Sequence, residues 1–173
     1  PFVRAEDHFP KVHLCTLGMH QRLALQQAKS KTTEAKLQLA GAYQAEISFL
    51  AESDTYATCL SDMGYEAHEG VTTRNFYTVG FNSSQDVSGS GTPSLLNGVV
   101  CSPSAENISF WLGTKGRSGS STGRSGSDIP SIAPTGEAFT IGAVGAVTQK
   151  ESDGIDTWII DQDKNTSHTV IGY

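Results

Sequence analysis

The longest regular pattern of apolar and polar positions lies in the first third of the chain. Residues 34–52 are almost all good helix formers, with no proline and a single glycine, which predicts a helix. We expect this helix to cover about residues 28–52. Because no capping box precedes Glu34, a start well before Ala28 is the alternative. Its broad apolar face, which we predict to pack on a sheet, contains Leu39, Tyr43, Ile47 and Leu50, together with Ala42 and Phe49.

The other side of the predicted helix carries small residues. Gly41, Ala45 and Ser48 recur at helical spacing and would let a second helix approach closely. Glu46 breaks the pattern, because it projects near the middle of the apolar face, where a buried and unpaired carboxylate is costly. We expect Glu46 to lie at the edge of the sheet beside a Lys or Arg; the alternative is an apolar face rotated by some tens of degrees.

Further along the chain, the period shortens to that of strands. Alternating apolar and polar residues predict four strands, at residues 74–81, 107–113, 137–148 and 154–161. The sheet would therefore span residues 74–161, after a connection at residues 53–73. Residues 162–173 are polar and then weakly apolar, and we predict a tail without a strand. One helix laid across a four-stranded antiparallel sheet is an α+β fold.

Two segments do not fit either pattern. Residues 1–27 contain three of the five histidines and no sustained periodicity, so we interpret them as an arm that is not native to the domain at residues 28–173. Residues 114–127 contain GRSGS twice, and this Gly/Ser composition predicts a mobile surface loop. The loop lacks the phosphate-binding pattern G-x-x-x-x-G-K-[ST].

Composition excludes several functions. The chain has 173 residues and 37% hydrophobic content, which suits one compact domain. The net charge is -6 and the Lys and Arg residues are scattered, which argues against nucleic-acid binding. No run of 18 apolar residues occurs, so the sequence predicts no membrane span.

The three cysteines form no C-x-x-C pair, which argues against a zinc site. His8, His13, Cys15 and His20 are a candidate metal cluster, but their irregular spacing and the lack of a second cysteine or carboxylate to complete a site disfavour it. We predict a disulfide between Cys59 and Cys101, formed in an oxidising compartment. Cys15 is not part of this predicted pair.

No catalytic arrangement is evident. The sequence has neither a G-x-S-x-G elbow nor the second histidine of a metalloprotease helix, and we predict that the protein is not an enzyme. The only cluster of carboxylates is Asp153, Asp156, Asp161 and Asp163. A calcium site is one interpretation, but the spacing fits no EF-hand, and we favour solvated strand ends and turns. We expect Trp111 and Trp158 to pack in the core.

Several segments resemble a known family. The run QAKSKTTEAKLQLAGAYQAEISFLAESDTY is similar to the C-terminal half of the first helix of type IV pilins. YATCLSDMGY, NFYTVGF and DTWIIDQDKNTSHTVIG resemble the connection, first strand and last strand of pilins from Gram-negative bacteria, especially delta-proteobacterial and predatory ones. The resemblance covers residues 27–173.

The resemblance implies a structural subunit without catalytic residues or cofactors. Identical subunits would polymerise, with the pilus assembly machinery, into an extracellular filament for adhesion, twitching motility or contact with prey or a host receptor. Subunits of the family reach the surface through the inner membrane and periplasm, and their mature N-terminus is methylated. In this picture the Leu39 face packs on the sheet and the Gly41 face meets neighbouring subunits.

The front of the chain departs from the family pattern. Mature pilins begin with an apolar segment that anchors the subunit in the membrane, whereas residues 1–27 carry several charged residues. We therefore expect that the hydrophobic half of the helix was replaced or removed. Two alternatives remain: a type II secretion pseudopilin, in which the Asp153–Asp163 carboxylates would correspond to the calcium site of the major pseudopilins, and a secreted binding module with a pilin-like fold.

Overall fold

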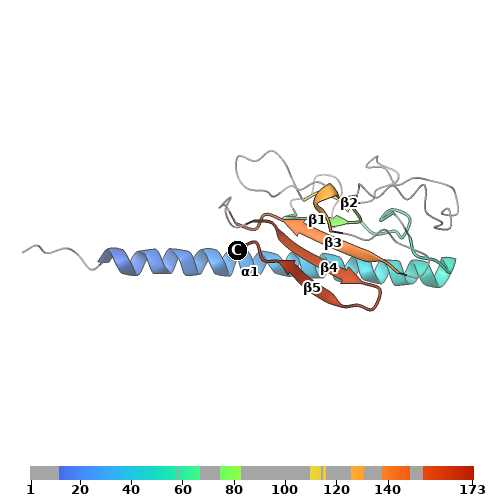
Figure 1. Cartoon of the computed structure of the whole chain (residues 1–173), viewed down its shortest axis with the longest axis horizontal. Helices are drawn as coiled ribbons and strands as arrows, with labels where there is room; N and C mark the ends of the chain where they lie inside the picture. Colours follow the sequence, from blue (N-terminus) through green and yellow to red (C-terminus); the bar gives the residue numbers. More distant parts are fainter. Residues whose placement is uncertain are drawn as a thin grey trace, which may run out of the picture.

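In the computed structural model, one long helix lies against an antiparallel sheet, which makes the fold α+β (Figure 1). The structure describes residues 12–57, 59–66, 75–82, 110–113, 115, 126–130, 138–148 and 154–173, with side chains of the helix described from residue 22 onward. The sheet lies beside the C-terminal part of the helix, and the N-terminal part projects beyond it (Figure 1).

The helix α1 spans Val12–Ser53, about 63 Å at 1.5 Å per residue. It begins earlier than residue 28, so residues 12–27 of the predicted arm continue the same helix. Its end agrees with the prediction, because Asp54 adopts a φ of 56° and its N–H donates to the carbonyl of Leu50 at 2.9 Å. A residue of left-handed conformation directly after the last turn is a common way to end a helix.

The described part of the sheet has five strands rather than the four predicted, in the order β2-β1-β3-β4-β5 with every neighbouring pair antiparallel. The strands are β1 (Tyr77–Gly80), β2 (Phe110–Trp111), β3 (Thr140–Gly145), β4 (Asp156–Asp161) and β5 (Thr166–Val170). The first four lie within the predicted ranges.

Strand β5 corrects the prediction that residues 162–173 form a tail. It is an edge strand paired only with β4 among the described strands. Four of its residues are exposed and only His168 is half-buried, so the strand has no alternation of apolar and polar residues to reveal it.

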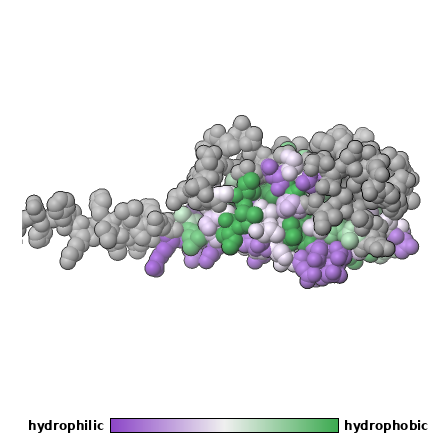
Figure 2. All heavy atoms as spheres, in the orientation of Figure 1, coloured by the Kyte–Doolittle hydropathy of each residue, from purple (hydrophilic) through white to green (hydrophobic). Residues whose placement is uncertain are grey.

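The core lies between α1 and the sheet. The residues that α1 buries follow a spacing of three and four: Ala28, Thr32, Ala35, Leu39, Ala42 and Glu46. The sheet contributes Tyr77, Val79, Phe139, Ile141, Ala143, Trp158 and Ile160. In the space-filling view, hydrophobic residues gather in the middle of the described surface and hydrophilic residues surround them, with the largest hydrophilic group at the lower edge (Figure 2).

On the helical wheel, the centre of the buried face of α1 is turned by about 50° from the centre of Leu39, Tyr43, Ile47 and Leu50, and by about 20° from the centre of all six predicted apolar residues. Leu39 is fully buried, but Tyr43, Ile47 and Leu50 are only half-buried. Tyr43 and Ile47 still pack against the core from one flank. The rotation arises because alanines, rather than the larger apolar residues, lie directly under the sheet, where they allow close packing.

Part of the predicted Gly/Ser loop is ordered structure. Gly126–Asp128 form the 3₁₀ helix η1, and Gly126 is buried. A Cβ at Gly126 would lie 2.3 Å from the ring of Phe110, so only glycine fits beneath this ring. The prediction of a surface position is therefore wrong for Gly126, whereas Ser127 is exposed. Most of the remaining loop lies outside the described residues.

Candidate functional site

Polar contacts fix the rotation of α1 on the sheet from one flank. The Lys31 ammonium donates to the carbonyl of Val147 at 2.7 Å. One carboxylate oxygen of Glu34 accepts the N–H groups of Phe76 and Tyr77, at 2.6 and 3.2 Å. Burial raises the pKa of Glu34, and these two N–H groups partly offset the effect. Glu34 thus ties the middle of α1 to the start of β1.

The other flank of α1 is held by aromatic and carbonyl contacts. The Lys36 ammonium lies 4.6 Å from the centre of the Trp158 ring, a cation–π distance. The Tyr43 hydroxyl donates to the carbonyl of Gln162 at 3.4 Å, and the Lys164 ammonium lies 5.9 Å from the Tyr43 ring. Because contacts hold both flanks of α1, the rotation of the helix about its axis is fixed, and the same residues always lie on the side opposite the sheet.

That opposite side forms an uncharged face, which we call the outward face. Measured at 100° per residue from Leu39, it consists of Leu23, Gln26, Ser30, Thr33, Leu37, Gly41, Gln44, Ser48 and Ala51, all of them exposed. The exposed fractions of Leu23 and Leu37 are 59% and 69%. An ordinary surface helix places its charges opposite the core, whereas here Arg22, Lys29 and Lys36 lie on one flank and the exposed Glu52 lies at the other border of the outward face.

The predicted filament-facing residues divide between two environments. Gly41 and Ser48 are exposed on the outward face, whereas Ala45 is half-buried and packs against the core. Tyr65 lies beside Gly41: its hydroxyl donates to the carbonyl of Gln38 at 3.1 Å, and a Cβ at Gly41 would lie 3.3 Å from its ring. Gly41 therefore also accommodates a side chain of its own domain. The prediction overlooked the exposed Leu23 and Leu37, although their spacing of fourteen residues places them on one line of the helix.

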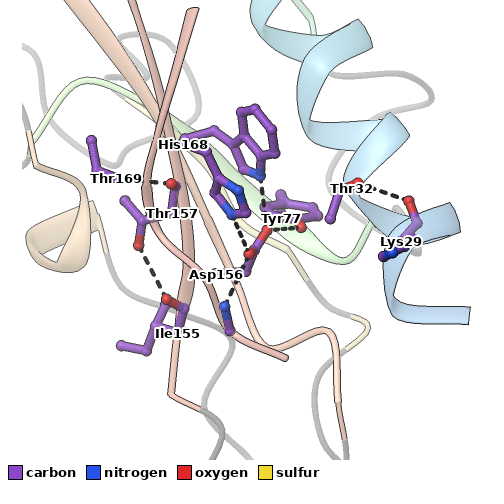
Figure 3. Close-up of polar contacts among 10 residues, drawn as sticks. Lys29, Thr32, Tyr77, Ile155, Asp156, Thr157, His168 and Thr169 are labelled. Carbon is purple, nitrogen blue, oxygen red and sulfur yellow. Dashed lines mark hydrogen bonds and ion pairs between the residues drawn. The ribbon is translucent and has the colours of Figure 1, made fainter. Parts of the chain in front are cut away.

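A second cluster surrounds Asp156, which is completely buried at the start of β4. One carboxylate oxygen accepts from Trp158 Nε1 at 2.8 Å and from the Tyr77 hydroxyl. The other contacts His168 Nε2 at 2.6 Å and accepts the Gly172 N–H at 3.1 Å. Figure 3 shows Tyr77 and His168 directed at this carboxylate from β1 and β5. Asp156 therefore joins β1, β4, β5 and the C-terminal residues.

The aromatic rings around Asp156 form a stack. The rings of Trp158 and His168 are 3.9 Å apart and nearly parallel, and Tyr173 lies 6.2 Å from His168. Trp158 is 8% exposed, in agreement with the predicted core role. The pKa of Tyr77 is raised by burial and by its hydrogen bond to Asp156, so the hydroxyl remains a donor.

The calcium candidates do not converge. Asp156 and Asp161 stand at opposite ends of β4, about 17 Å apart at 3.3 Å per residue. Asp161 instead accepts the N–H groups of Asp163 and Asn165 at 3.0 and 2.8 Å, an arrangement typical of a turn. Asp153 lies outside the described residues, and within them no group of three or more His, Cys, Asp or Glu is placed to hold a metal.

Glu46 differs from the expectation that it lies at the edge with a basic partner. Its side chain is 0% exposed, and neither oxygen has a hydrogen-bond partner among the described residues. Desolvation raises the pKa of Glu46 to about 8. The Ala57 N–H is close enough to lower the pKa slightly, but it does not form a hydrogen bond of normal geometry.

Cys59 is buried and disulfide-bonded. Cys101 and the side chain of Cys15 lie outside the described part of the chain, so the Cys59–Cys101 pairing stays a prediction.

Comparisons with known proteins leave the family open. No protein-family model matches the chain, and no curated protein is significantly similar to it. Across the part of the chain that the structure describes, no helix is both long and apolar enough to cross a membrane.

Proposed function

We propose that this protein is a structural subunit of a type IV pilus filament, in which copies assemble by packing along helix α1. The observation that carries the proposal is the outward face, which exposes Leu23 and Leu37 without a charge along its length. Exposed apolar residues arranged along one line of a helix mark a surface that packs against another helix. We choose the type IV pilin family because motifs in the helix, the connection and the strands resemble those of pilins.

The small residues of the outward face favour the same function. Ser30 lies between the two leucines on this face, and Gly41 and Ser48 follow them; small residues let helix backbones approach closely. The N-terminal part of α1 projects beyond the sheet (Figure 1), and the outward face of the described side chains begins at Leu23. In this proposal the sheet domain decorates the filament and the helix joins its subunits, while adhesion, motility or host contact takes place at the surface that the sheet domain presents.

The pseudopilin alternative receives no support from the described carboxylates. Asp156 already contacts four groups of the fold, and Asp161 closes a turn.

The test is an assembly assay in cells that produce the whole gene product with a pilus assembly system. We expect antibodies against this chain to label surface filaments in electron micrographs, and mass spectrometry to detect the chain in sheared filaments. The double variant Leu23→Asp/Leu37→Asp should reduce the filament yield at least tenfold, because it places charges within the helix contact.

Leu112→Asp provides the matched control. Leu112 is 50% exposed but follows β2 rather than lying on α1, so this variant should assemble normally. Unfolding midpoints of the purified variants should match that of the parent, since all three leucines are exposed. Absence of the chain from sheared filaments, or equal yields for both variants, would reject the proposal.

A further inference from the structure

The buried carboxyl of Glu46 serves no visible structural purpose. It occupies a core position on α1, where it is completely shielded from water and unpartnered among the described residues. Buried polar groups are almost always hydrogen-bonded, and a buried charge without a partner is especially costly. Ionisation of such a group therefore strongly destabilises the closed structure around it.

The segment at residues 54–57 lies beside Glu46, since the Ala57 N–H is close to its carboxyl and the charge of Glu46 raises the pKa of Tyr56. This segment is anchored at both ends. On one side, the Asp54 N–H donates to the Leu50 carbonyl at the end of α1. On the other side, Cys59 and Leu60 are fully buried, and Cys59 is held by its disulfide. Between these anchors Ala57 is fully buried and Tyr56 half-buried.

The contacts of this segment are apolar. The Tyr56 ring stands edge-on to the Phe139 ring at 4.9 Å. Apart from the Ala57 N–H, which lies near the Glu46 carboxyl, the described residues show no hydrogen bond from Tyr56 or Ala57 to the rest of the fold. An apolar contact of this size is weak enough to break locally while the sheet stays folded.

We propose that residues 54–57 form a pH-operated flap, which is closed over the neutral carboxyl of Glu46 and opens when that carboxyl ionises. The flap is the least costly route by which water can reach the charge, because the helix and β3 behind Glu46 belong to the core. This inference concerns a site inside the domain and does not depend on the proposed filament function.

The neighbouring titratable groups do not offset the charge. From α1 the neighbour is Tyr43 and from the flap it is Tyr56, whose pKa is raised by burial and by the charges of Glu46 and Asp163. From β3 the packed ring is that of Phe139, which carries no charge. Lys164, in the β4–β5 turn, lies over the Tyr43 ring at 5.9 Å, and neither Glu46 oxygen has a hydrogen-bond partner among the described residues.

The pKa gives the direction and range of the response. Glu46 is neutral in the closed form until the pH reaches about 8, but in an open, solvated form it would ionise near its ordinary value of 4.5. Linkage therefore makes the opening equilibrium rise about tenfold per pH unit between these two values and level off above them. From pH 5.5 to pH 7.5 the increase should be about 70-fold.

The experiment is amide hydrogen exchange measured by NMR on the whole chain at pH 5.5, 6.5 and 7.5. Protection factors, which remove the intrinsic pH dependence of exchange, report the opening equilibrium. We expect the protection of the Ala57 amide to fall about 70-fold over this range in the parent and to stay constant in Glu46→Gln. Glu52→Gln, at an exposed position of the same helix, should behave like the parent.

The Tyr65 amide, which donates to the carbonyl of Leu60 at 2.9 Å, lies beyond the second anchor and should keep its protection. Equal pH dependence of Ala57 in the parent and Glu46→Gln would overturn the proposal. A parallel loss of protection at Tyr65 and in the strands would also overturn it, because the response would then be unfolding rather than the opening of a flap.

Discussion

Replacement of Asp156 is the sharpest test of how the C-terminal part of the fold is held. The carboxylate offers two acceptor oxygens to Tyr77, Trp158, His168 and Gly172. Asp156→Asn keeps one oxygen and replaces the other with an NH₂ group. If the retained oxygen faces Tyr77 and Trp158, the new NH₂ can donate to His168 Nε2 in its neutral acceptor tautomer. The Gly172 N–H, however, then meets a donor.

The magnitude follows from these contacts. One buried N–H loses its acceptor, which costs about 1–3 kcal/mol, and the remaining hydrogen bonds lose their charge assistance. We expect Asp156→Asn to lower the free energy of unfolding by about 3 kcal/mol. Asp156→Ala removes the acceptors of all four groups and leaves a cavity, so it should cost about 5 kcal/mol.

Urea denaturation followed by circular dichroism measures both losses, with Trp158 fluorescence as a local probe. Asp163→Asn is the control, because Asp163 is exposed and its side chain makes a single exposed hydrogen bond with Gln162; its unfolding free energy should change by less than about 0.5 kcal/mol. A loss below about 1 kcal/mol for Asp156→Asn, or equal losses for Asn and Ala, would refute the role of Asp156 as the junction of these elements.

Three further predictions use the same unfolding assay. Because the folded pKa of Glu46 is raised to about 8, the parent loses stability as the pH rises from about 4.5 to 8; Glu46→Gln should be more stable by about 3 kcal/mol at pH 7 and nearly equal at pH 4.5. Gly126→Ala should cost about 1–3 kcal/mol because its Cβ would strike the Phe110 ring. Gly41→Ala on α1 should change stability by less than about 1 kcal/mol, because the gain in helix propensity is opposed by a Cβ only 3.3 Å from the Tyr65 ring. Glu34→Ala should cost about 2 kcal/mol because two amides at the start of β1 lose their acceptor, and Glu34→Gln less than half of that.

The fold class and most elements could be predicted from the sequence because they rest on periodicity. The end of α1 coincides with the change from helix formers to the polar Ser53 and Asp54. The strand at β4 was visible in the alternation of Asp156, Trp158 and Ile160. Strand β5 could not be predicted in this way, because an exposed edge strand has no apolar face to impose a period.

The polar groups of the core were harder to predict. The alternation that revealed β4 places Asp156 on the same face as two buried apolar residues, and this signal could have assigned it to the core. The sequence analysis instead assigned Asp156 to a solvated strand end or turn, because Asp usually favours turns. No local pattern could supply the partners of Asp156, since Tyr77 and His168 come from strands distant in the chain. The sequence showed that Glu46 conflicts with the apolar face of the helix. Only the rotation of α1 in the structure showed that Glu46 is buried rather than placed at the edge of the sheet.

The same contacts that fix this rotation determine what α1 can present to another molecule. If the helix turned by one residue, about 100°, Lys31 and Glu34 would leave Val147 and Phe76, and charged side chains would enter the outward face. The ties on the two flanks, through Glu34 on one side and Lys36 on the other, therefore keep the charges beside the sheet. A helix that serves only as one layer of a domain gains nothing from such segregation, because charges facing water are tolerated at any angle. The segregation is useful when another helix occupies the opposite side, and this is why the rotation of α1, more than its length, argues for assembly.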